Sequence, residues 1–196
     1  MEPKRIKTPI DEDTVRGLTV GDFVLLSGRV VTGRDRVHKY LYKKSPEQVE
    51  LPLELEGLVL YHCGPIVRKL KDGFEIVSAG PTTSIRMEIY EPWVIKNYGI
   101  RGIIGKGGMG METLKAMKEA GCVYMHTISG AAAYLAKRIK RVVDVWNEEE
   151  FGMTEALWVL EVEEFPVIIT MDAKGNSLHD SVLKQTEQQY RGLLNL

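Results

Sequence analysis

The sequence has few cysteines and no long apolar run, and both shortages exclude whole classes of protein. Its 196 residues include two cysteines, Cys63 and Cys122. Two cysteines are too few for a disulfide framework, and they form no CxxC pair, so a reduced, cytoplasmic setting is expected. The sequence has no run of about 18 apolar residues, so no transmembrane helix is expected. The N-terminus lacks the apolar stretch of a signal peptide.

The sequence also lacks an excess of charge of either sign. Its 26 Lys and Arg residues balance 27 Asp and Glu residues, which gives a formal net charge of -1. No overall field therefore favours binding to nucleic acid or to an anionic membrane, and neither is expected as a partner. An anionic ligand would have to be bound by cations gathered locally.

Strands and helices are predicted to alternate through the middle of the chain. Residues 1–20 are charged and contain Pro3 and Pro9, so they are expected to form an extended N-terminal segment before a single domain at 21–196. Strands are predicted at 23–33, 57–64, 73–80, 100–105 and 122–128. Helices are predicted at 34–44, at 85–99 with a break at Pro92, at 111–121, at 131–146 and at 176–196. With a strand pair expected over 156–175, the pattern indicates a mixed α/β domain.

Three segments at the ends of predicted strands carry side chains suited to binding an anion. In open α/β sheets ligands bind at the carboxyl ends of strands, so we expect the three to converge. The first is GPTTSIRME, residues 80–88, in which Thr82, Thr83 and Arg86 fall within one turn at a predicted helix start. Two hydroxyls, a helix N-terminus and a guanidinium suit a carboxylate. The alternative is a helix cap beside a surface arginine.

The second segment is the glycine loop that contains Lys106. Four glycines in the six positions 105–110 allow close approach of the backbone to a ligand. The loop lacks the GxxxxGK[ST] pattern, and no acidic residue is placed as in a dinucleotide fold, so nucleotide binding is disfavoured. A lysine that binds a small carboxylate fits better, and the alternative is a mobile loop with a solvated lysine.

The third segment is SGRVVTGRDRVHK, residues 27–39. Arg34 follows a strand, and Asp35 is placed to orient it toward a second carboxylate, although a charged helix start is an alternative. No metal site is predicted on this chain, because the adjacent pair His62 and Cys63 lacks further ligands at metal-binding spacing.

Together these motifs resemble a known set. GRDxxHK, GPTTSxRME and GKGGMG, with HCGPIVRK at 62–69, are similar to the β component of two-subunit class I fumarases and of L(+)-tartrate dehydratase. The resemblance covers most of the chain. It implies a swivelling β/β/α domain with a mixed central sheet or barrel-like core flanked by helices. It also implies a hydro-lyase that adds water reversibly across the double bond of a small dicarboxylate, as in the hydration of fumarate to L-malate.

The resemblance further implies roles for individual residues and for a partner. Thr82 would be the catalytic proton acceptor. Substrate would be bound by Arg34, Thr83, Arg86 and Lys106, with Arg36 left open as an alternative to Arg34. A [4Fe–4S] cluster would be held by three cysteines of a separate α subunit and not by this chain. Pairs of α and β subunits would then dimerise.

Several alternatives stay open on the sequence alone. The same motifs fit the β subunit of L(+)-tartrate dehydratase, and mesaconate is a further substrate to be tested. A non-catalytic anion-binding module would use the same loops without turnover. The roles of His38 and His62 are not assigned.

Overall fold

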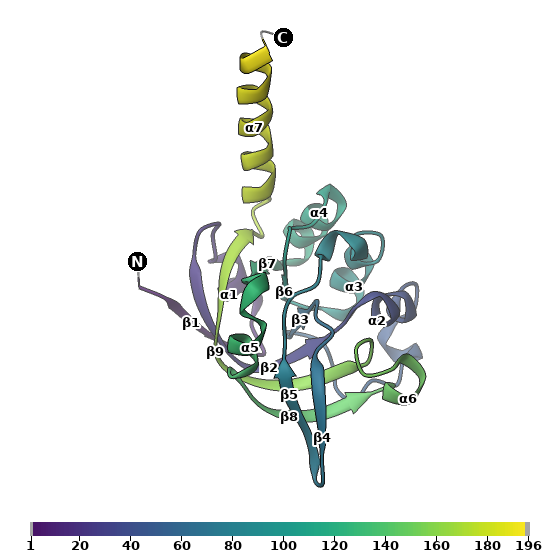
Figure 1. The fold of residues 1–196 in the computed structure, drawn as a ribbon. Coiled ribbons are helices and arrows are strands. Elements are labelled where there is room, and N and C mark those ends of the chain that lie inside the picture. The colour runs from purple at the N-terminus through teal and green to yellow at the C-terminus, as the bar shows by residue number, and fades with distance from the viewer. Residues whose placement is uncertain (1, 195–196) are drawn as a thin grey trace.

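The computed structural model describes residues 2–194, and a closed sheet of five strands lies at its centre (Figure 1). Parallel neighbours follow one another in the order β2 (Phe23–Thr32), β3 (Val59–Tyr61), β6 (Gly102–Gly105) and β7 (Val123–His126). The long strand β9 (Leu157–Met171) runs antiparallel to both β7 and β2, so the sheet closes on itself. The predicted mixed, barrel-like α/β core is therefore confirmed.

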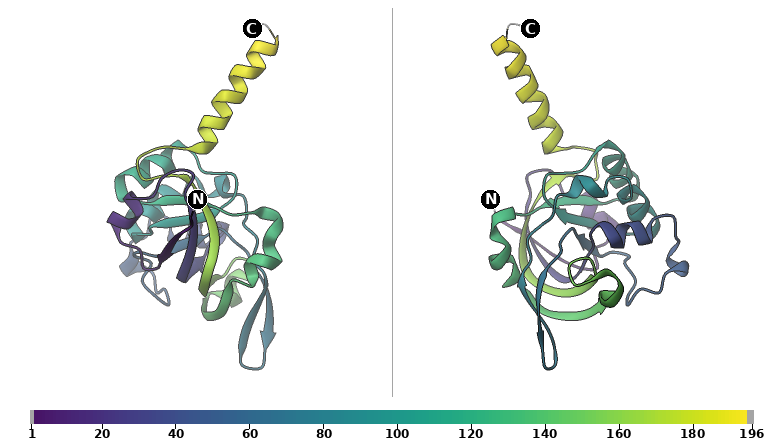
Figure 2. Two further views of the ribbon diagram at one scale, coloured as in Figure 1. Left: turned by 90° about the vertical axis from the view of Figure 1, so that its left-hand side faces the viewer. Right: turned by 45° about the vertical axis from the view of Figure 1, so that its right-hand side comes forward.

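Four further strands lie outside the barrel. Strand β1 (Lys4–Lys7) pairs parallel with β2, and β8 (Ile139–Trp146) pairs antiparallel with β9. A separate hairpin is formed by β4 (Ile66–Leu70) and β5 (Gly73–Ser78), and it projects from the body of the molecule (Figure 2).

Short helices connect the strands. They are α1 (Glu12–Arg16), α2 (Asp35–Leu41), α3 (Glu91–Tyr98), α4 (Met111–Ala120), α5 (Ala132–Ala136), α6 (Glu148–Phe151) and the longer α7 (Leu178–Leu194), with 3-10 turns η1 (Pro46–Gln48), η2 (Ser84–Met87) and η3 (Ser129–Ala131). Helix α7 stands away from the body in every view of Figures 1 and 2. Within residues 2–194 no helix combines the length and apolarity needed to cross a bilayer.

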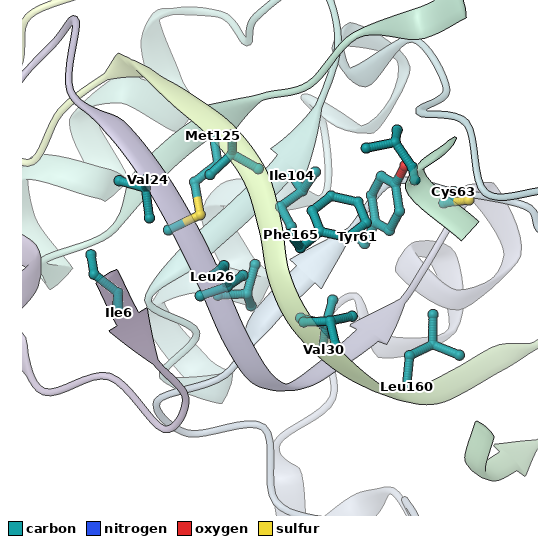
Figure 3. Close-up of a cluster of buried hydrophobic side chains, with 14 of the residues drawn as sticks. Ile6, Val24, Leu26, Val30, Tyr61, Cys63, Ile104, Met125, Leu160 and Phe165 are labelled. Carbon is teal, nitrogen blue, oxygen red and sulfur yellow. The ribbon is translucent and has the colours of Figure 1, made fainter. Parts of the chain in front are cut away.

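Alternate residues along each strand face two different hydrophobic clusters. One cluster fills the barrel, where Val24, Tyr61, Ile104, Met125 and Phe165 meet (Figure 3). The next residue of the same strands points outward, as with Leu60, Ile103 and Tyr124, and packs against α2, α3 and α4. A period of two with both faces buried is what a parallel sheet covered by helices requires.

Most of the predicted elements are present. Pro92 lies in the first turn of α3, and the predicted break separates α3 from the turn η2 before it. Helix α4 ends at Gly121, whose φ of 71° is a left-handed conformation that glycine adopts without strain. Of the predicted helix at 176–196, α7 is present over Leu178–Leu194, and residues 195–196 lie outside the described part of the chain.

Two predictions at the C-terminal side are wrong. Residues 131–146, predicted as one helix, form the short helix α5 and then β8, whose Ile139, Val142 and Val145 suit a strand paired with β9. Residues 156–175, predicted as a strand pair, contain the single strand β9. Glu164, with φ of 48°, lies where the register with β2 shifts, so the chain bends there without turning back.

The N-terminal segment is not simply extended. Strand β1 and helix α1 lie within residues 1–20, and Ile6, Val15 and Leu18 are buried in the barrel-side cluster. Asp11 caps α1 by accepting a hydrogen bond from the Thr14 backbone N–H at 2.7 Å. The segment is therefore part of the folded body.

Candidate functional site

The parallel strands bring their carboxyl ends to one edge of the barrel, and the three sequence motifs meet there. Strand β2 leads to Arg34, β3 leads to His62 and β6 leads to Lys106. The segment Thr82–Ser84 crosses between the last two strand ends. The Thr82 N–H donates to the His62 carbonyl at 2.7 Å, and the Ser84 N–H donates to the Lys106 carbonyl at 3.1 Å. The expected convergence of the motifs is thus observed in the backbone.

Two arginines from different motifs share one carboxylate. Arg86 Nη2 donates to Thr82 Oγ1 and to Asp35 Oδ2, both at 3.0 Å. Arg34 Nη2 lies 3.9 Å from the same Asp35 oxygen and 3.1 Å from Glu155 Oε1. The Arg86 and Arg34 side chains are 43% and 26% exposed, so both remain accessible to a ligand. Glu155 was not predicted, because it lies far along the chain and belongs to no motif.

Arg36 points to a different part of the molecule. Its Nη1 donates to the Glu150 carbonyl at 2.9 Å, and its guanidinium carbon lies 5.9 Å from the centre of the Phe151 ring. Both residues belong to α6. Of the two arginines left open by the sequence, Arg34 is therefore the one that lies beside Thr82 and Arg86.

Lys106 joins the site through its backbone, and its side chain bonds to Ser129. Its backbone forms a parallel bridge with Thr83, and its Nζ donates to Ser129 Oγ at 3.1 Å. Gly107 and Gly108 follow with φ of 83° and 77°, which lets the chain turn away directly after the lysine.

The threonine motif leads into a short 3-10 turn, and the N-terminus of α4 is occupied by a side chain of this chain. Thr83 precedes the short 3-10 turn η2 and makes no side-chain cap, so the alternative of a threonine helix cap is wrong for this residue. The N-terminus of α4 is occupied by Glu88, whose carboxylate accepts from the Gly110 and Thr113 N–H groups at 2.7 and 3.1 Å. Binding of an anion at this edge therefore depends on side-chain cations.

A buried cluster of His38, His62 and Glu91 lies directly behind the site. His38 Nε2 and His62 Nε2 lie 2.8 and 3.0 Å from the same Glu91 oxygen, Oε2, and all three side chains are fully buried. We call these three residues the triad.

The triad also contacts the loop that carries Arg34 and the segment that carries Thr82 and Arg86. His38 Nδ1 lies 2.7 Å from the Arg34 carbonyl, and His62 Nδ1 lies 2.9 Å from Ser84 Oγ. Ser84 Oγ in turn lies 2.8 Å from Tyr124 Oη.

Burial and the contacts within the triad shift the pKa values of its three members. Burial alone would raise the pKa of Glu91, but the two histidines outweigh it and lower the pKa to about 2. Burial alone would lower the pKa of His38, but the charge and hydrogen bond of Glu91 outweigh it and raise the pKa. Burial lowers the pKa of His62, and the charge of His38 lowers it further. The triad therefore favours a charged Glu91 carboxylate, and His38 binds a proton more readily than His62 does.

Sequence reasoning did not find the triad. His62 and Glu91 are 29 residues apart and His38 and Glu91 are 53 apart, so no local spacing links them. His38 belongs to the GRDxxHK motif, and Glu91 immediately precedes Pro92 at a helix start. Glu91 is recognised as a partner of the two histidines only because it is buried, and no sequence pattern predicts that a glutamate will be buried.

The cysteines of this chain do not fit an iron–sulfur cluster. Cys63 and Cys122 are both free and buried. Burial raises the pKa of Cys63 to about 12 and raises that of Cys122 as well, whereas a metal ligand must be a thiolate. Two protonated thiols are too few for the cysteine ligands of such a cluster.

Comparison with known protein families shows to which family the chain belongs. The model of the Fumarase C-terminus family matches residues 3–182. The chain belongs to this family. The resemblance drawn from the motifs is confirmed.

Similar proteins are named either as a class I fumarate hydratase or as an L(+)-tartrate dehydratase subunit beta. A Geobacillus stearothermophilus protein provisionally named a class I fumarate hydratase is 46% identical over 182 residues, which are 92% of this chain and 34% of that protein. The chain therefore spans about a third of that relative. A provisionally named L(+)-tartrate dehydratase subunit beta from Methanocaldococcus jannaschii is 42% identical over 93% of this chain and 94% of its own length. The Escherichia coli K12 L(+)-tartrate dehydratase subunit beta is 39% identical over 89% of this chain and 86% of its own length.

The triad predicts how the stability of the chain depends on pH. The lowered pKa of Glu91 stabilises the folded chain above the ordinary value of 4.5, and this contribution is lost as the pH falls toward about 2. The raised pKa of His38 stabilises the folded chain fully below the ordinary pKa of 6.5, and this stabilisation is lost as the pH rises through the raised pKa. The free energy of unfolding of the wild type should therefore exceed that of Glu91→Gln most strongly between pH 4.5 and pH 6.5.

Urea denaturation from pH 3 to pH 9 would measure this difference, which we expect to reach about 3 kcal/mol because a buried pair is broken. Glu187→Gln, on the exposed side of α7, is the matched control and should change little at any pH. A difference between wild type and Glu91→Gln that stays constant across this range would contradict the assigned charges.

Proposed function

We propose that this chain is the β subunit of a two-subunit iron–sulfur hydro-lyase that reversibly hydrates fumarate to L-malate. The observation that carries the proposal is the meeting of Arg34, Thr82 and Arg86 at one strand edge, in a chain of this family. Dehydration of L(+)-tartrate is the second candidate, supported by the printed names of the β-subunit relatives.

The cations at this edge suit the chemistry of a small diacid. Removal of a proton from the carbon next to a carboxylate builds negative charge on that carboxylate. Fixed cations that bind this charge more strongly as it develops lower the barrier. Arg86 Nε and Nη1 make no hydrogen bond to the described residues, so they are free to bind a carboxylate oxygen. Arg34, Thr83 and Lys106 would complete the contacts to the two carboxylates.

Thr82 is the proposed proton acceptor. A threonine hydroxyl is a weak base unless its alkoxide is stabilised. Arg86 Nη2 donates to Thr82 Oγ1 at 3.0 Å, so a positive charge already lies against the oxygen that would become negative. The backbone N–H of Thr82 is held by the His62 carbonyl, which fixes where this hydroxyl is presented.

The proposal includes a partner subunit, because the two cysteines of this chain are too few to hold a [4Fe–4S] cluster. We propose that an α subunit carries the [4Fe–4S] cluster and covers this edge, and that two such pairs dimerise. Ile85, Ile89 and Ile128 lie exposed on the segments around Thr82 and Ser129, and exposed apolar side chains near a site are typical of a contact surface. The free thiols support a reducing, cytoplasmic setting.

Co-expression with an α subunit of this enzyme class tests the proposed function. The purified complex should be brown and oxygen-sensitive, and it should hydrate fumarate, dehydrate L(+)-tartrate or act on mesaconate in spectrophotometric assays. The substrate with the highest kcat/KM identifies the physiological class. A stable complex that turns over none of the three would refute the proposal and favour a non-catalytic anion-binding role.

Arg34 and Arg36 offer a matched pair of substitutions. Arg34→Lys should lower kcat/KM of the complex by about 100-fold, because lysine cannot bind a carboxylate with two parallel hydrogen bonds. Arg36→Lys should leave kcat/KM within about threefold, because Arg36 contacts α6 and lies away from Thr82. The reverse ranking in steady-state assays would assign the substrate arginine to Arg36.

Thr82 is tested by separating turnover from binding. Thr82→Ala should lower kcat by at least about 10²-fold, because it removes the proton acceptor, and should leave the Kd for malate or tartrate largely unchanged. Thr82→Ser keeps a hydroxyl and should retain most of the activity. If Thr82→Ala abolishes ligand binding in calorimetric titration, the hydroxyl serves to hold Arg86 and is not the base.

A further inference from the structure

The two loops that present the site are far apart in sequence, yet both contact the buried triad. The Arg34 carbonyl meets His38, and Ser84 meets His62, while Glu91 joins the two histidines. Ser84 is two residues from Thr82 and from Arg86. The triad thus links the loop that carries Arg34 to the segment that carries Thr82 and Arg86.

The hydrogen positions in the triad follow from its contacts. A carbonyl oxygen only accepts, so His38 Nδ1 must carry a proton to bond the Arg34 carbonyl. His38 Nε2 lies 2.8 Å from Glu91 Oε2, and the proton of this contact belongs to the nitrogen because the lowered pKa of Glu91 keeps the carboxylate ionised. With both nitrogens protonated, His38 is an imidazolium paired with the Glu91 carboxylate.

The second histidine completes the network as a neutral ring. His62 Nε2 donates to Glu91 Oε2 at 3.0 Å, so its Nδ1 accepts from the Ser84 hydroxyl. The Ser84 oxygen then accepts from the Tyr124 hydroxyl at 2.8 Å. One positive and one negative charge cancel within a fully buried cluster.

A metal ion is not needed to explain the cluster. The three ligand atoms lie within 4.8 Å of one another, a separation that allows a metal. Tetrahedral zinc with bonds of about 2.0–2.1 Å would hold ligand atoms about 3.3 Å apart. The observed nitrogen-to-oxygen distances of 2.8 and 3.0 Å are those of hydrogen bonds.

Stability alone does not account for the triad. A buried ion pair is often no more stabilising than apolar side chains of the same volume. Glu91 Oε1 also lacks any hydrogen-bond partner, which adds to the cost of burying the carboxylate. What the triad provides, and apolar packing would not, is a directed hydrogen bond to each of the two loops.

We propose that His38, Glu91 and His62 are positioning residues that fix the Arg34 loop and the Thr82–Arg86 segment relative to each other for substrate binding. This inference rests on the proposed function. Its physical reason is that a shift of about 1 Å in a group that binds the reacting part of a substrate lowers the rate about 100-fold. The triad holds both loops before any ligand arrives.

The ring nitrogens of the histidines test the charge assignment directly. The chain has four histidines, so a ¹⁵N spectrum of the full chain resolves each ring, with His→Gln variants for assignment. At pH 7.5 we expect both nitrogens of His38 protonated and His62 neutral with the proton on Nε2. Glu91→Gln should remove the Nε2 proton of His38. Two neutral rings in the wild type, or one equivalent of bound metal by elemental analysis that is lost in Glu91→Gln, would overturn the proposal.

Kinetics of the complex with the α subunit test the positioning role. Glu91→Gln should lower kcat/KM about 10–100-fold. Ser84→Ala is a milder second variant, which keeps the His38–Glu91 pair and removes the link to the Thr82 segment. It should lower kcat/KM about tenfold while the His38 ring stays doubly protonated. Val15→Ala, a core truncation in α1 away from both loops, is the control for lost stability and should leave kcat/KM unchanged.

The outcomes separate the two proposals. If the wild-type complex is active and both triad variants match it in kcat/KM, the positioning role is refuted and the hydro-lyase function stands. If the wild-type complex has no activity, the hydro-lyase function fails and the positioning role fails with it. The ¹⁵N spectra then still report on the charges of the triad.

Discussion

The pairing of β9 with two strands at once is the constraint on which the rest of the structure depends. Strand β9 bonds to β2 on one side and to β7 on the other, and it bends at Glu164 to do so. Without that closure the parallel strands would form an open sheet with β2 and β7 at opposite ends. The parallel neighbours β2, β3 and β6 all end on one rim of this closed barrel, and Arg34, His62 and Lys106 follow those strand ends.

At that rim the arginines are held by carboxylates of the chain itself. Asp35 bonds to Arg86 and Glu155 bonds to Arg34, so neither guanidinium is left to move freely. Under the proposed function, a ligand would meet cations whose directions are already set, which reduces the ordering that binding requires. The net positive charge presented is small, so specificity would come from geometry more than from long-range attraction.

The sequence predicted the parts of this site that lie within short motifs. Thr82 and Arg86 are four residues apart, and Arg34 directly follows a strand, so their placement could be inferred from local pattern and strand polarity. Glu91 and Glu155 could not be predicted, because their importance depends on contacts with residues far along the chain. The same reason explains the errors in the fold: β8 is a strand because β9 lies beside it, and β9 bends at Glu164 without turning back because β2 pairs with it on both sides of that residue.

Glu88 ties together two parts of the rim that would otherwise move separately. It directly follows η2, and its carboxylate holds Gly110 and Thr113 at the start of α4. A loop of four glycines would normally lose much conformational entropy when it becomes fixed. Because Glu88 anchors the far end of this loop when the chain folds, that loss is already part of folding, and the loop after Lys106 is bonded to the segment that follows Arg86.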